Sequence, residues 1–135
     1  MALKSTTIVQ TELIPGVTPM QVYEALVNAR KHAAFTGAAA TGAAKVGARF
    51  TAWDGYIFGK HLELEAPRRI VQEWATTEWP EGSPPSKLEW TFAEKKDGVE
   101  VTMTHSAVPS SQAESYRQGW IDYYWTPLKQ YFAAR

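Results

Sequence analysis

The spacing of hydrophobic residues along the 135-residue chain is strand-like at the N-terminus, then helical, then strand-like again over the middle. Residues 5–13 are rich in threonine and β-branched side chains and lead into a Pro-Gly turn, a pattern typical of a strand. From Thr18, the sequence T-P-M-Q supplies an N-cap, a proline at the first helical position and a glutamine three residues after the cap. The pattern therefore predicts a first strand followed by a helix that begins at Pro19.

Two short helices are expected after the first strand. Hydrophobic residues at helical spacing predict the buried face of the first helix; they are Met20, Tyr23, Leu26 and Val27. Residues 30–35 are predicted to form a second short helix, and the alanine- and glycine-rich residues 36–45 to form a loop.

Between residues 47 and 105, hydrophobic and polar residues alternate, which is the period of a β-strand. Asp54-Gly55 lies between two apolar runs and predicts a two-residue hairpin, because both central positions of a type I′ turn need positive φ. Gly59 inside the next strand indicates a bulge or a bend. Three further turn signals divide the remainder into three more strands: Ala66-Pro67, residues 80–85 and Lys96-Asp97-Gly98.

Residues 111–134 are the most aromatic segment and are predicted to form one long helix. Ser111 with Glu114 three residues later forms a predicted capping box. Residues at spacings of four, four and three place one aromatic face on this helix: Trp120, Tyr124, Leu128 and Tyr131. Pro127 is expected to kink the helix, because proline lacks an amide donor and displaces the carbonyl four residues earlier.

The order of elements is strand, one or two helices, five strands and a long helix. Sequential hairpins with helices gathered on one face fit an α+β domain with an antiparallel sheet. One helix cannot bury so much aromatic surface alone, so we expect a six-stranded sheet curved around the C-terminal helix. The prediction is a single domain over residues 1–135, with an arrangement that can enclose a cavity.

Composition excludes several classes of function. Fourteen Lys and Arg balance fourteen Asp and Glu, so no long-range field attracts nucleic acid or an anionic membrane. The absence of cysteine excludes disulfides and thiolate nucleophiles. No apolar run approaches the ~20 residues of a membrane span, and the N-terminus lacks a signal-peptide core. We expect a cytoplasmic monomer or weak homodimer without nucleic-acid or membrane partners.

Seven short stretches follow one another in an order typical of one known family. They are Ala34-Phe35-Thr36, Gly47-Ala48-Arg49-Phe50, Gly55-Tyr56-Ile57-Phe58-Gly59, Pro67 with Ile70-Val71 and Trp74, Trp79-Pro80-Glu81-Gly82, Val108-Pro109, and Gly119-Trp120 with Tyr123-Tyr124. From about Thr11 to Phe132 the chain resembles the activator of Hsp90 ATPase homologue family, in particular the C-terminal domain of that co-chaperone. The resemblance implies a START-like, birch-pollen-allergen-like helix-grip fold.

The resemblance also implies two kinds of partner, an Hsp90-type chaperone and an apolar small molecule. In the two-domain co-chaperone, a separate N-terminal domain carries a major part of chaperone binding. Many single-domain relatives have no assigned activity. Members of the wider superfamily bind lipids, sterols or polyketides, and some are cyclases or hydrolases.

Candidate ligand-binding residues come from the predicted sheet and the final helix, where aromatic side chains either fill the core or line a cavity. The candidates are Tyr56, Phe58, Trp74, Trp90, Phe92, Met103, His105, Trp120, Tyr124 and Tyr131. If Trp79, Trp125 or Phe132 were exposed, they would instead mark a protein contact surface. A binding domain without catalysis is the favoured hypothesis.

His105 continues the inward side of the sixth predicted strand, which leaves two interpretations. It is either a hydrogen-bonded core residue or the acid/base of a small cyclase- or hydrolase-like enzyme that uses the same cavity. The three histidines lie on separate elements with no i, i+4 pair, so no metal site is predicted. No cofactor is expected either, because the chain has no P-loop and no dinucleotide-binding glycine pattern.

Overall fold

A computed structural model describes residues 4–134, and it confirms the expected α+β helix-grip fold. The elements are β1 (Ser5–Pro15), α1 (Pro19–Val27), α2 (Ala29–Thr36), β2 (Arg49–Ala52), a short turn (Trp53–Gly55), β3 (Ile57–Glu65), β4 (Arg69–Thr76), β5 (Ser86–Lys95), β6 (Gly98–Pro109), α3 (Ala113–Trp120), a π turn (Ile121–Trp125) and α4 (Thr126–Ala133). The strands form one antiparallel sheet in the order β1-β6-β5-β4-β3-β2. No helix within residues 4–134 is long and apolar enough to cross a membrane.

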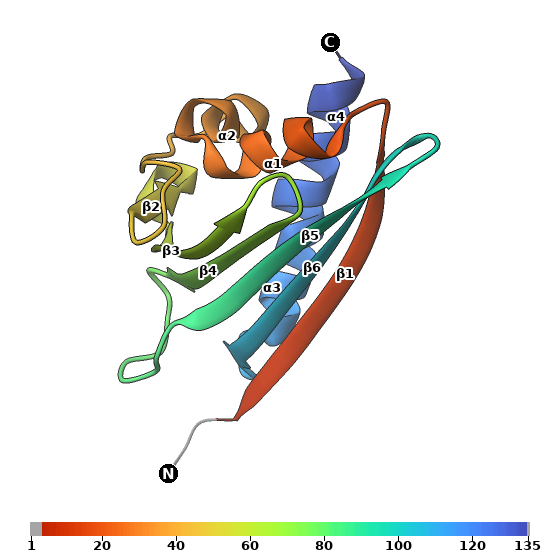
Figure 1. Cartoon of the computed structure of the whole chain (residues 1–135). Coiled ribbons are helices and arrows are strands. Elements are labelled where there is room, and N and C mark those ends of the chain that lie inside the picture. The colour runs from red at the N-terminus through yellow and green to blue at the C-terminus, as the bar shows by residue number, and fades with distance from the viewer. Residues whose placement is uncertain (1–3, 135) are drawn as a thin grey trace.

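The C-terminal helix lies in the curve of the sheet, while α1 and α2 lie beside its α4 end (Figure 1). The alternation predicted for β5 and β6 is confirmed, since their inward side chains are buried beneath the helices. These inward residues are Leu88, Trp90, Phe92, Val99, Val101, Met103 and His105. The two hairpin-connected strands therefore form the centre of the core.

The C-terminal helix runs continuously from Ala113 to Ala133, and its middle turn is wider than an α-turn. In that turn, the N–H of Thr126 donates to the carbonyl of Ile121, five residues earlier, directly before Pro127. In a regular α-helix, the proline ring would clash with the carbonyl four residues earlier. The extra residue in this turn moves the backbone so that this clash is relieved. The predicted irregularity is therefore a π turn.

The buried face predicted for the C-terminal helix is partly wrong, because the prediction assumed α-helical spacing throughout and the helix contains a π turn. Trp120, Tyr124 and Leu128 are buried as expected, but Tyr131 is 37% exposed and Phe132 is 9% exposed. Because the wide turn adds one residue, the buried face continues at a spacing of four and reaches Phe132. Trp125 is also buried, so neither Trp125 nor Phe132 belongs to an exposed contact surface.

Both predicted short helices exist, and the capping box at Thr18 and Gln21 is confirmed by its two reciprocal hydrogen bonds. The burial predicted for Met20 is wrong, because this side chain is 41% exposed. Val22 and Ala25 occupy the buried face together with Tyr23, Leu26 and Val27. Met20 lies about 200° around the helix from Val22 and therefore points to solvent.

The helix start predicted at Ser111 is wrong, because α3 begins at Ala113 and no side chain caps it. Its first amides are satisfied by a tight turn instead, in which the N–H of Gln112 donates to Pro109 and that of Ala113 to Ser110. A local backbone turn has replaced the side-chain cap.

The hairpin at Asp54-Gly55 exists, but its predicted two-residue turn is wrong. Ala52 pairs with Ile57, so four residues connect β2 to β3. Positive φ extends over Trp53, Asp54 and Gly55, and the N–H of Ala39 donates to the Asp54 carboxylate. Trp53 and Tyr56 therefore belong to the turn and take no part in the pairing of β2 with β3.

Gly59 is needed because two backbones approach closely, and the β3 register shift lies further on, at His61 and Glu63. A Cβ on Gly59 would lie 1.9 Å from the Glu73 carbonyl oxygen and 2.8 Å from a Phe50 ring atom. Neighbouring Phe58 lies on the outer face of the sheet and is 42% exposed. Its predicted place beside a cavity is therefore wrong.

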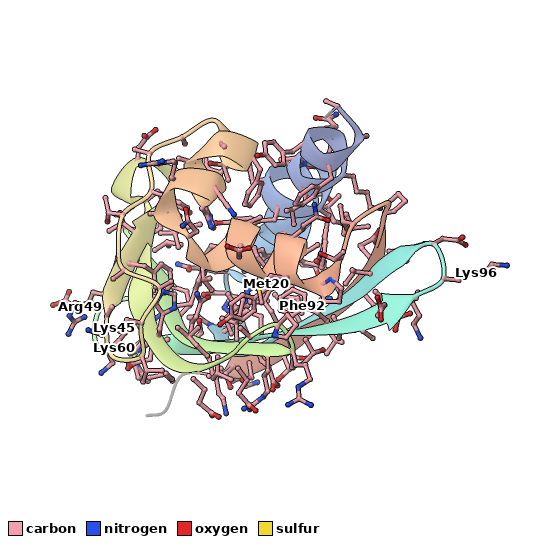
Figure 2. The ribbon with its side chains drawn as sticks, turned by 45° about the horizontal axis from the view of Figure 1, so that its top comes forward. Met20, Lys45, Arg49, Lys60, Phe92 and Lys96 are labelled. Atoms are coloured by element: carbon pink, nitrogen blue, oxygen red, sulfur yellow. The ribbon has the colours of Figure 1, made fainter. Side chains whose placement is uncertain are left out.

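Charged side chains cover the outer face of the sheet and its edges. Arg69 joins three carboxylates there, those of Glu63, Glu65 and Glu89. Lys45, Arg49 and Lys60 gather at the β2 corner, whereas Lys96 projects from the β5–β6 turn at the opposite end (Figure 2). The charges are thus distributed around the surface, in agreement with a net charge of zero.

His105 is completely buried, and hydrogen bonds fix its tautomer. The Trp120 indole N–H donates to His105 Nδ1 over 3.1 Å, so the ring proton must lie on Nε2. That Nε2 donates to Ser86 Oγ over 2.8 Å, and Ser86 donates to the carbonyl of Trp74. Burial lowers the pKa of His105 to about 3, so the ring is neutral.

His32 and His61 are also held in the neutral form. His32 Nδ1 donates to the Leu26 carbonyl, and its Nε2 accepts from the Tyr124 hydroxyl. Burial lowers the pKa of His32 to about 4, against the opposing effect of the Leu26 carbonyl. His61 stacks on Phe50, and burial lowers its pKa as well.

These histidines predict a loss of stability in mild acid. An unfolded histidine takes up a proton near pH 6.5, while folded His32 and His105 stay neutral until about pH 4 and about pH 3. The free energy of unfolding should therefore fall below pH 6.5, by about 2 kcal/mol per histidine at pH 5. Urea unfolding followed by tryptophan fluorescence at pH 7.5 and pH 5.0 measures it.

The matched variant for this prediction is His105→Gln, whose amide can accept from Trp120 and donate to Ser86 but does not titrate. Its stability should fall less between the two pH values than that of the native chain. Equal unfolding free energies of the native chain at pH 7.5 and pH 5.0 would contradict the prediction.

Two glycine substitutions test the close contact at Gly59. Gly59→Ala should lower the free energy of unfolding by about 3 kcal/mol, because the new methyl group collides with the backbone of Glu73. Gly82→Ala is the control, since nothing lies within 4 Å and only its positive φ of 81° opposes alanine, at about 1 kcal/mol. Urea unfolding compares the two, and equal losses would show that β3 and β4 can separate at little cost.

Candidate functional site

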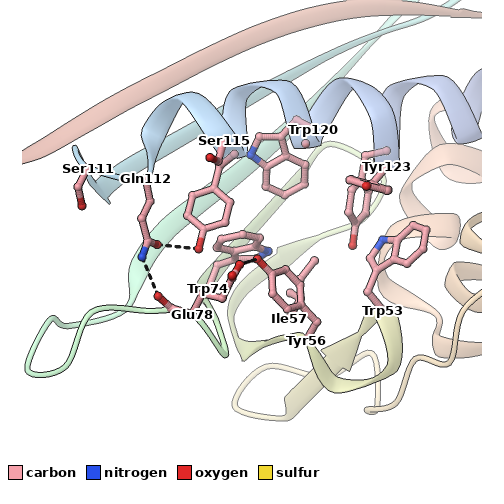
Figure 3. Close-up of a pocket in the computed structure, with 13 residues that line it drawn as sticks. Trp53, Tyr56, Ile57, Trp74, Glu78, Ser111, Gln112, Ser115, Trp120 and Tyr123 are labelled. Atoms are coloured by element: carbon pink, nitrogen blue, oxygen red, sulfur yellow. Dashed lines mark hydrogen bonds between the residues drawn. The ribbon is translucent and has the colours of Figure 1, made fainter.

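An open cleft of about 520 Å³ lies between the first half of the C-terminal helix and the ends of β3 and β4. The residues that line it are Trp53, Tyr56, Ile57, Trp74, Glu78, Ser111, Gln112, Ser115, Tyr116, Gly119, Trp120, Tyr123 and Tyr124. We call it the aromatic cleft. Helix residues form one wall, and the turn before β3 with the end of β4 forms the other (Figure 3).

Trp74 lies at the centre of the cleft, where rings from the sheet and the helix meet. Its ring centroid is 5.3 Å from those of Tyr116 and Trp120. At the far end, Trp53 from the turn and Tyr123 from the helix approach edge to face with 5.2 Å between centroids. These distances are typical of packed aromatic pairs, so the walls support one another without a ligand.

A chain of hydrogen bonds crosses the mouth of the cleft and joins the sheet to the helix. The Tyr116 hydroxyl donates to Gln112 Oε1 over 2.7 Å and accepts from the Thr76 hydroxyl. Gln112 Nε2 donates to the backbone carbonyl of Glu78 over 2.7 Å (Figure 3). This network fixes Gln112 and Tyr116, so the position of the mouth is preorganised.

The carboxylate of Glu78 accepts a hydrogen bond from the Tyr56 hydroxyl. Burial raises the pKa of Tyr56, and the hydrogen bond to Glu78 raises it further. Burial also raises the pKa of Tyr116, and the charge of Glu78 adds to that shift. The mouth of the cleft therefore carries negative potential while both hydroxyls keep their protons.

Tyr124 forms the inner end of the cleft, and its hydroxyl donates to His32 Nε2 over 2.9 Å. Burial raises the pKa of Tyr124, and the nearby Trp53 indole opposes part of that shift. The Trp53 Nε1 itself is buried without a partner that meets hydrogen-bond geometry. Trp53 is thus held in the wall by ring packing and not by a hydrogen bond of its side chain.

Deeper between the sheet and the helix, the remaining space is small. A second cavity of about 20 Å³ lies among His61, Gln72, Leu88, Trp90 and Trp120. This volume suits about one water molecule. The space between the sheet and the helix is therefore packed by side chains, apart from the aromatic cleft at its edge. A separate shallow pocket of about 480 Å³ lies between the start of α2 and residues 42–44, and no aromatic side chain lines it.

The ten candidate residues divide into three groups. Tyr56, Trp74, Trp120 and Tyr124 line the aromatic cleft. Trp90 lies against the small inner cavity, and the buried residues away from the cleft are Phe92, Met103 and His105. Phe58 and Tyr131 are exposed elsewhere on the surface. Four of the ten predicted residues thus lie together in the cleft, and the other six lie in the core or on other parts of the surface.

Several lining residues were missed, and some of them left a signal in the sequence. The missed residues Tyr116, Gly119 and Tyr123 recur at helical spacing beside the predicted Trp120, and they mark a second aromatic stripe with a gap at the glycine. Glu78 left no such signal, because its position depends on how the loop after β4 folds against Gln112.

Comparison with known proteins gives relatives named as activators of an Hsp90 ATPase. The chain is 33% identical over 115 residues to the human activator of 90 kDa heat shock protein ATPase homolog 1, which covers 85% of this chain and 34% of that protein. It is 30% identical over 104 residues to the Dictyostelium discoideum activator of 90 kDa heat shock protein ATPase homolog, covering 76% and 27%. The chain spans between about a quarter and a third of the length of these relatives.

Solved structures share the fold over nearly the whole chain. An HSP90 activator from Plasmodium falciparum superposes with a TM-score of 0.83 at 22% identity, covering 98% of this chain and 97% of that one. The Aha1 dimer from Colwellia psychrerythraea gives a TM-score of 0.73 at 17% identity, covering 87% and 90%.

The family match covers every element after β1, including those that line the aromatic cleft. The model described as Activator of Hsp90 ATPase homolog 1-like protein matches residues 16–133, from the end of β1 to the end of α4. This chain belongs to the family of Activator of Hsp90 ATPase homolog 1-like proteins.

Proposed function

We propose that this chain is a binding domain without catalysis that receives an apolar small molecule in the aromatic cleft. The observation that carries the proposal is the cleft itself, a space of about 520 Å³ with aromatic walls and a preorganised polar mouth. Sites for small molecules typically have volumes of 300–1,000 Å³ and combine apolar walls with a few oriented polar groups.

The arrangement of polar groups supports binding over catalysis. A general acid or base must come within hydrogen-bond reach of its substrate. His105, the candidate for that role, is buried outside the cleft lining, and both of its ring nitrogens are bonded to Ser86 and Trp120. The tyrosine hydroxyls of the mouth have raised pKa values, which makes them hydrogen-bonding groups at neutral pH.

Association with an Hsp90-type chaperone is the second candidate function, and the comparisons favour it. The relatives are named as activators of an Hsp90 ATPase. The Plasmodium falciparum protein described as an HSP90 activator has nearly the same extent as this chain, since 97% of it is covered. A solved chain of nearly this length and with this fold therefore carries that description.

Ligand binding can be tested by filling the cleft from the helix. Gly119 faces the cleft, and the nearest atom to a Cβ there is Tyr123 Cδ2 at 3.9 Å. Gly119→Leu should occupy the cleft without a backbone collision and should favour the helix. Native mass spectrometry of the freshly purified native chain should show a releasable extra mass. The fraction of the protein that carries this mass should be at least tenfold lower in the variant.

The control for this experiment is Gln118→Leu, which places the same side chain on the exposed neighbouring position. It should keep the extra mass of the native chain. A bare mass for the native chain, or equal retention in both variants, would contradict the proposal that the cleft is occupied.

The chaperone role predicts a change in Hsp90 activity. Addition of the chain to a purified Hsp90 should raise its ATPase rate in a concentration-dependent, saturable way, because binding must bias the chaperone toward its hydrolysing state. The chain alone provides the blank. An unchanged rate at saturating concentration, together with no detectable complex, would remove the chaperone from the functions of this chain.

A further inference from the structure

We propose that the aromatic cleft selects an organic cation, an apolar molecule whose positively charged amine lies between Glu78 and the aromatic walls. This inference rests on the proposed ligand-binding function and specifies the chemistry of the ligand.

The charge of the cleft lining is the first observation. Among the described residues that line it, Glu78 is the one formally charged side chain, and none is Lys, Arg or His. Seven other carboxylates in residues 4–134 pair with Lys or Arg, those of Glu12, Glu24, Glu63, Glu65, Glu73, Glu89 and Glu114, whereas that of Glu78 accepts from a tyrosine. The cleft thus contains a negative charge without a neutralising cation.

The aromatic walls are the second observation. A cation is attracted to the face of an aromatic ring within about 6 Å of its centroid, and tryptophan gives the strongest attraction. Three tryptophans line the cleft, Trp53, Trp74 and Trp120, together with tyrosines that include Tyr123. The Trp74 and Trp120 centroids lie 5.3 Å apart, so one position in the cleft can lie within about 6 Å of both rings.

The directions of the hydrogen bonds at the mouth are the third observation. The Tyr56 hydroxyl donates its proton to Glu78, and the Tyr116 hydroxyl donates its proton to Gln112. The Tyr116 oxygen already accepts from the Thr76 hydroxyl, so the Tyr56 oxygen and the second carboxylate oxygen of Glu78 remain as acceptors. An ammonium ion supplies donors or positive charge and matches this set, whereas a carboxylate or phosphate would meet oxygens of its own sign.

The N-terminus of α3 also borders the cleft, through Gln112 and Ser115, and its partial positive charge would favour an anion. Two features oppose it. The backbone N–H groups of Gln112 and Ala113 already donate to the carbonyls of Pro109 and Ser110, and the side-chain amide of Gln112 is already bonded to Glu78 and Tyr116. The negative charge of Glu78 at the mouth therefore decides the charge of the ligand that the cleft prefers.

Three ring compounds of similar size test the inference. Phenyltrimethylammonium is the cation, tert-butylbenzene is its neutral isostere, and benzoate is the anion. Each dissociation constant is measured from the quenching of intrinsic tryptophan fluorescence, since three of the six tryptophans line the cleft. The cation should bind the native chain about fivefold or more tightly than the isostere, and benzoate should bind more weakly than either.

Glu78→Gln removes the charge and keeps the shape of the side chain. It should weaken binding of the cation about threefold and leave the affinity for tert-butylbenzene unchanged. Glu81→Gln is the matched control, because Glu81 lies in the same loop outside the cleft lining, and it should leave both affinities unchanged.

Equal affinity for cation and isostere, or tighter binding of benzoate, would overturn the inference while the proposed ligand binding stands. Loss of affinity for both compounds in Glu78→Gln would also overturn it, because the role of Glu78 would then be structural. If none of the three compounds binds, the inference fails, and the mass comparison with Gly119→Leu still decides the proposed function separately.

Discussion

The contact between the C-terminal helix and the inner face of the sheet is the interaction on which the rest of the structure depends. Trp120 lies at its centre, 5.5 Å from Trp90 and 5.3 Å from Trp74 between ring centroids, and its N–H donates to His105. Each large ring buries roughly 150–250 Å². Because the single polar atom of Trp120 is paired within this contact, the helix is fixed in both position and rotation.

This fixed rotation explains how Pro127 is accommodated. Leu128 and Phe132 must reach the same core as Trp120, but an ideal α-helix would bring Tyr131 to that face. The π turn before Pro127 adds one residue, so the buried face of the last part of the helix is shifted by one position along the sequence. Proline and core packing are therefore satisfied by the same local change, and Tyr131 is left at the surface.

Features that depend on the local residue pattern could be predicted from the sequence. The positions of side chains that are determined by contacts between distant segments could not. The alternation in β5 and β6 determined the inward side of Trp90 and His105. The phase shift at Tyr131 followed from a backbone hydrogen-bond pattern that residue spacing does not encode. In the cleft, Trp74 and Trp120 could be predicted as inward residues, whereas Trp53 depended on a turn with three positive φ angles and Glu78 on the loop after β4.

The position of Gly119 connects this packing to function. Glycine costs about 1 kcal/mol relative to alanine inside a helix, and neither positive φ nor crowding requires it here, since the nearest atom to a Cβ would be 3.9 Å away. Its missing side chain leaves space beside Trp120 and Tyr123, where the sheet does not cover the helix. The helix thus gives up stability at the one turn where a side chain would narrow the cleft. The absence of a side chain at Gly119 therefore keeps the cleft open beside the contact of Trp74 with Trp120.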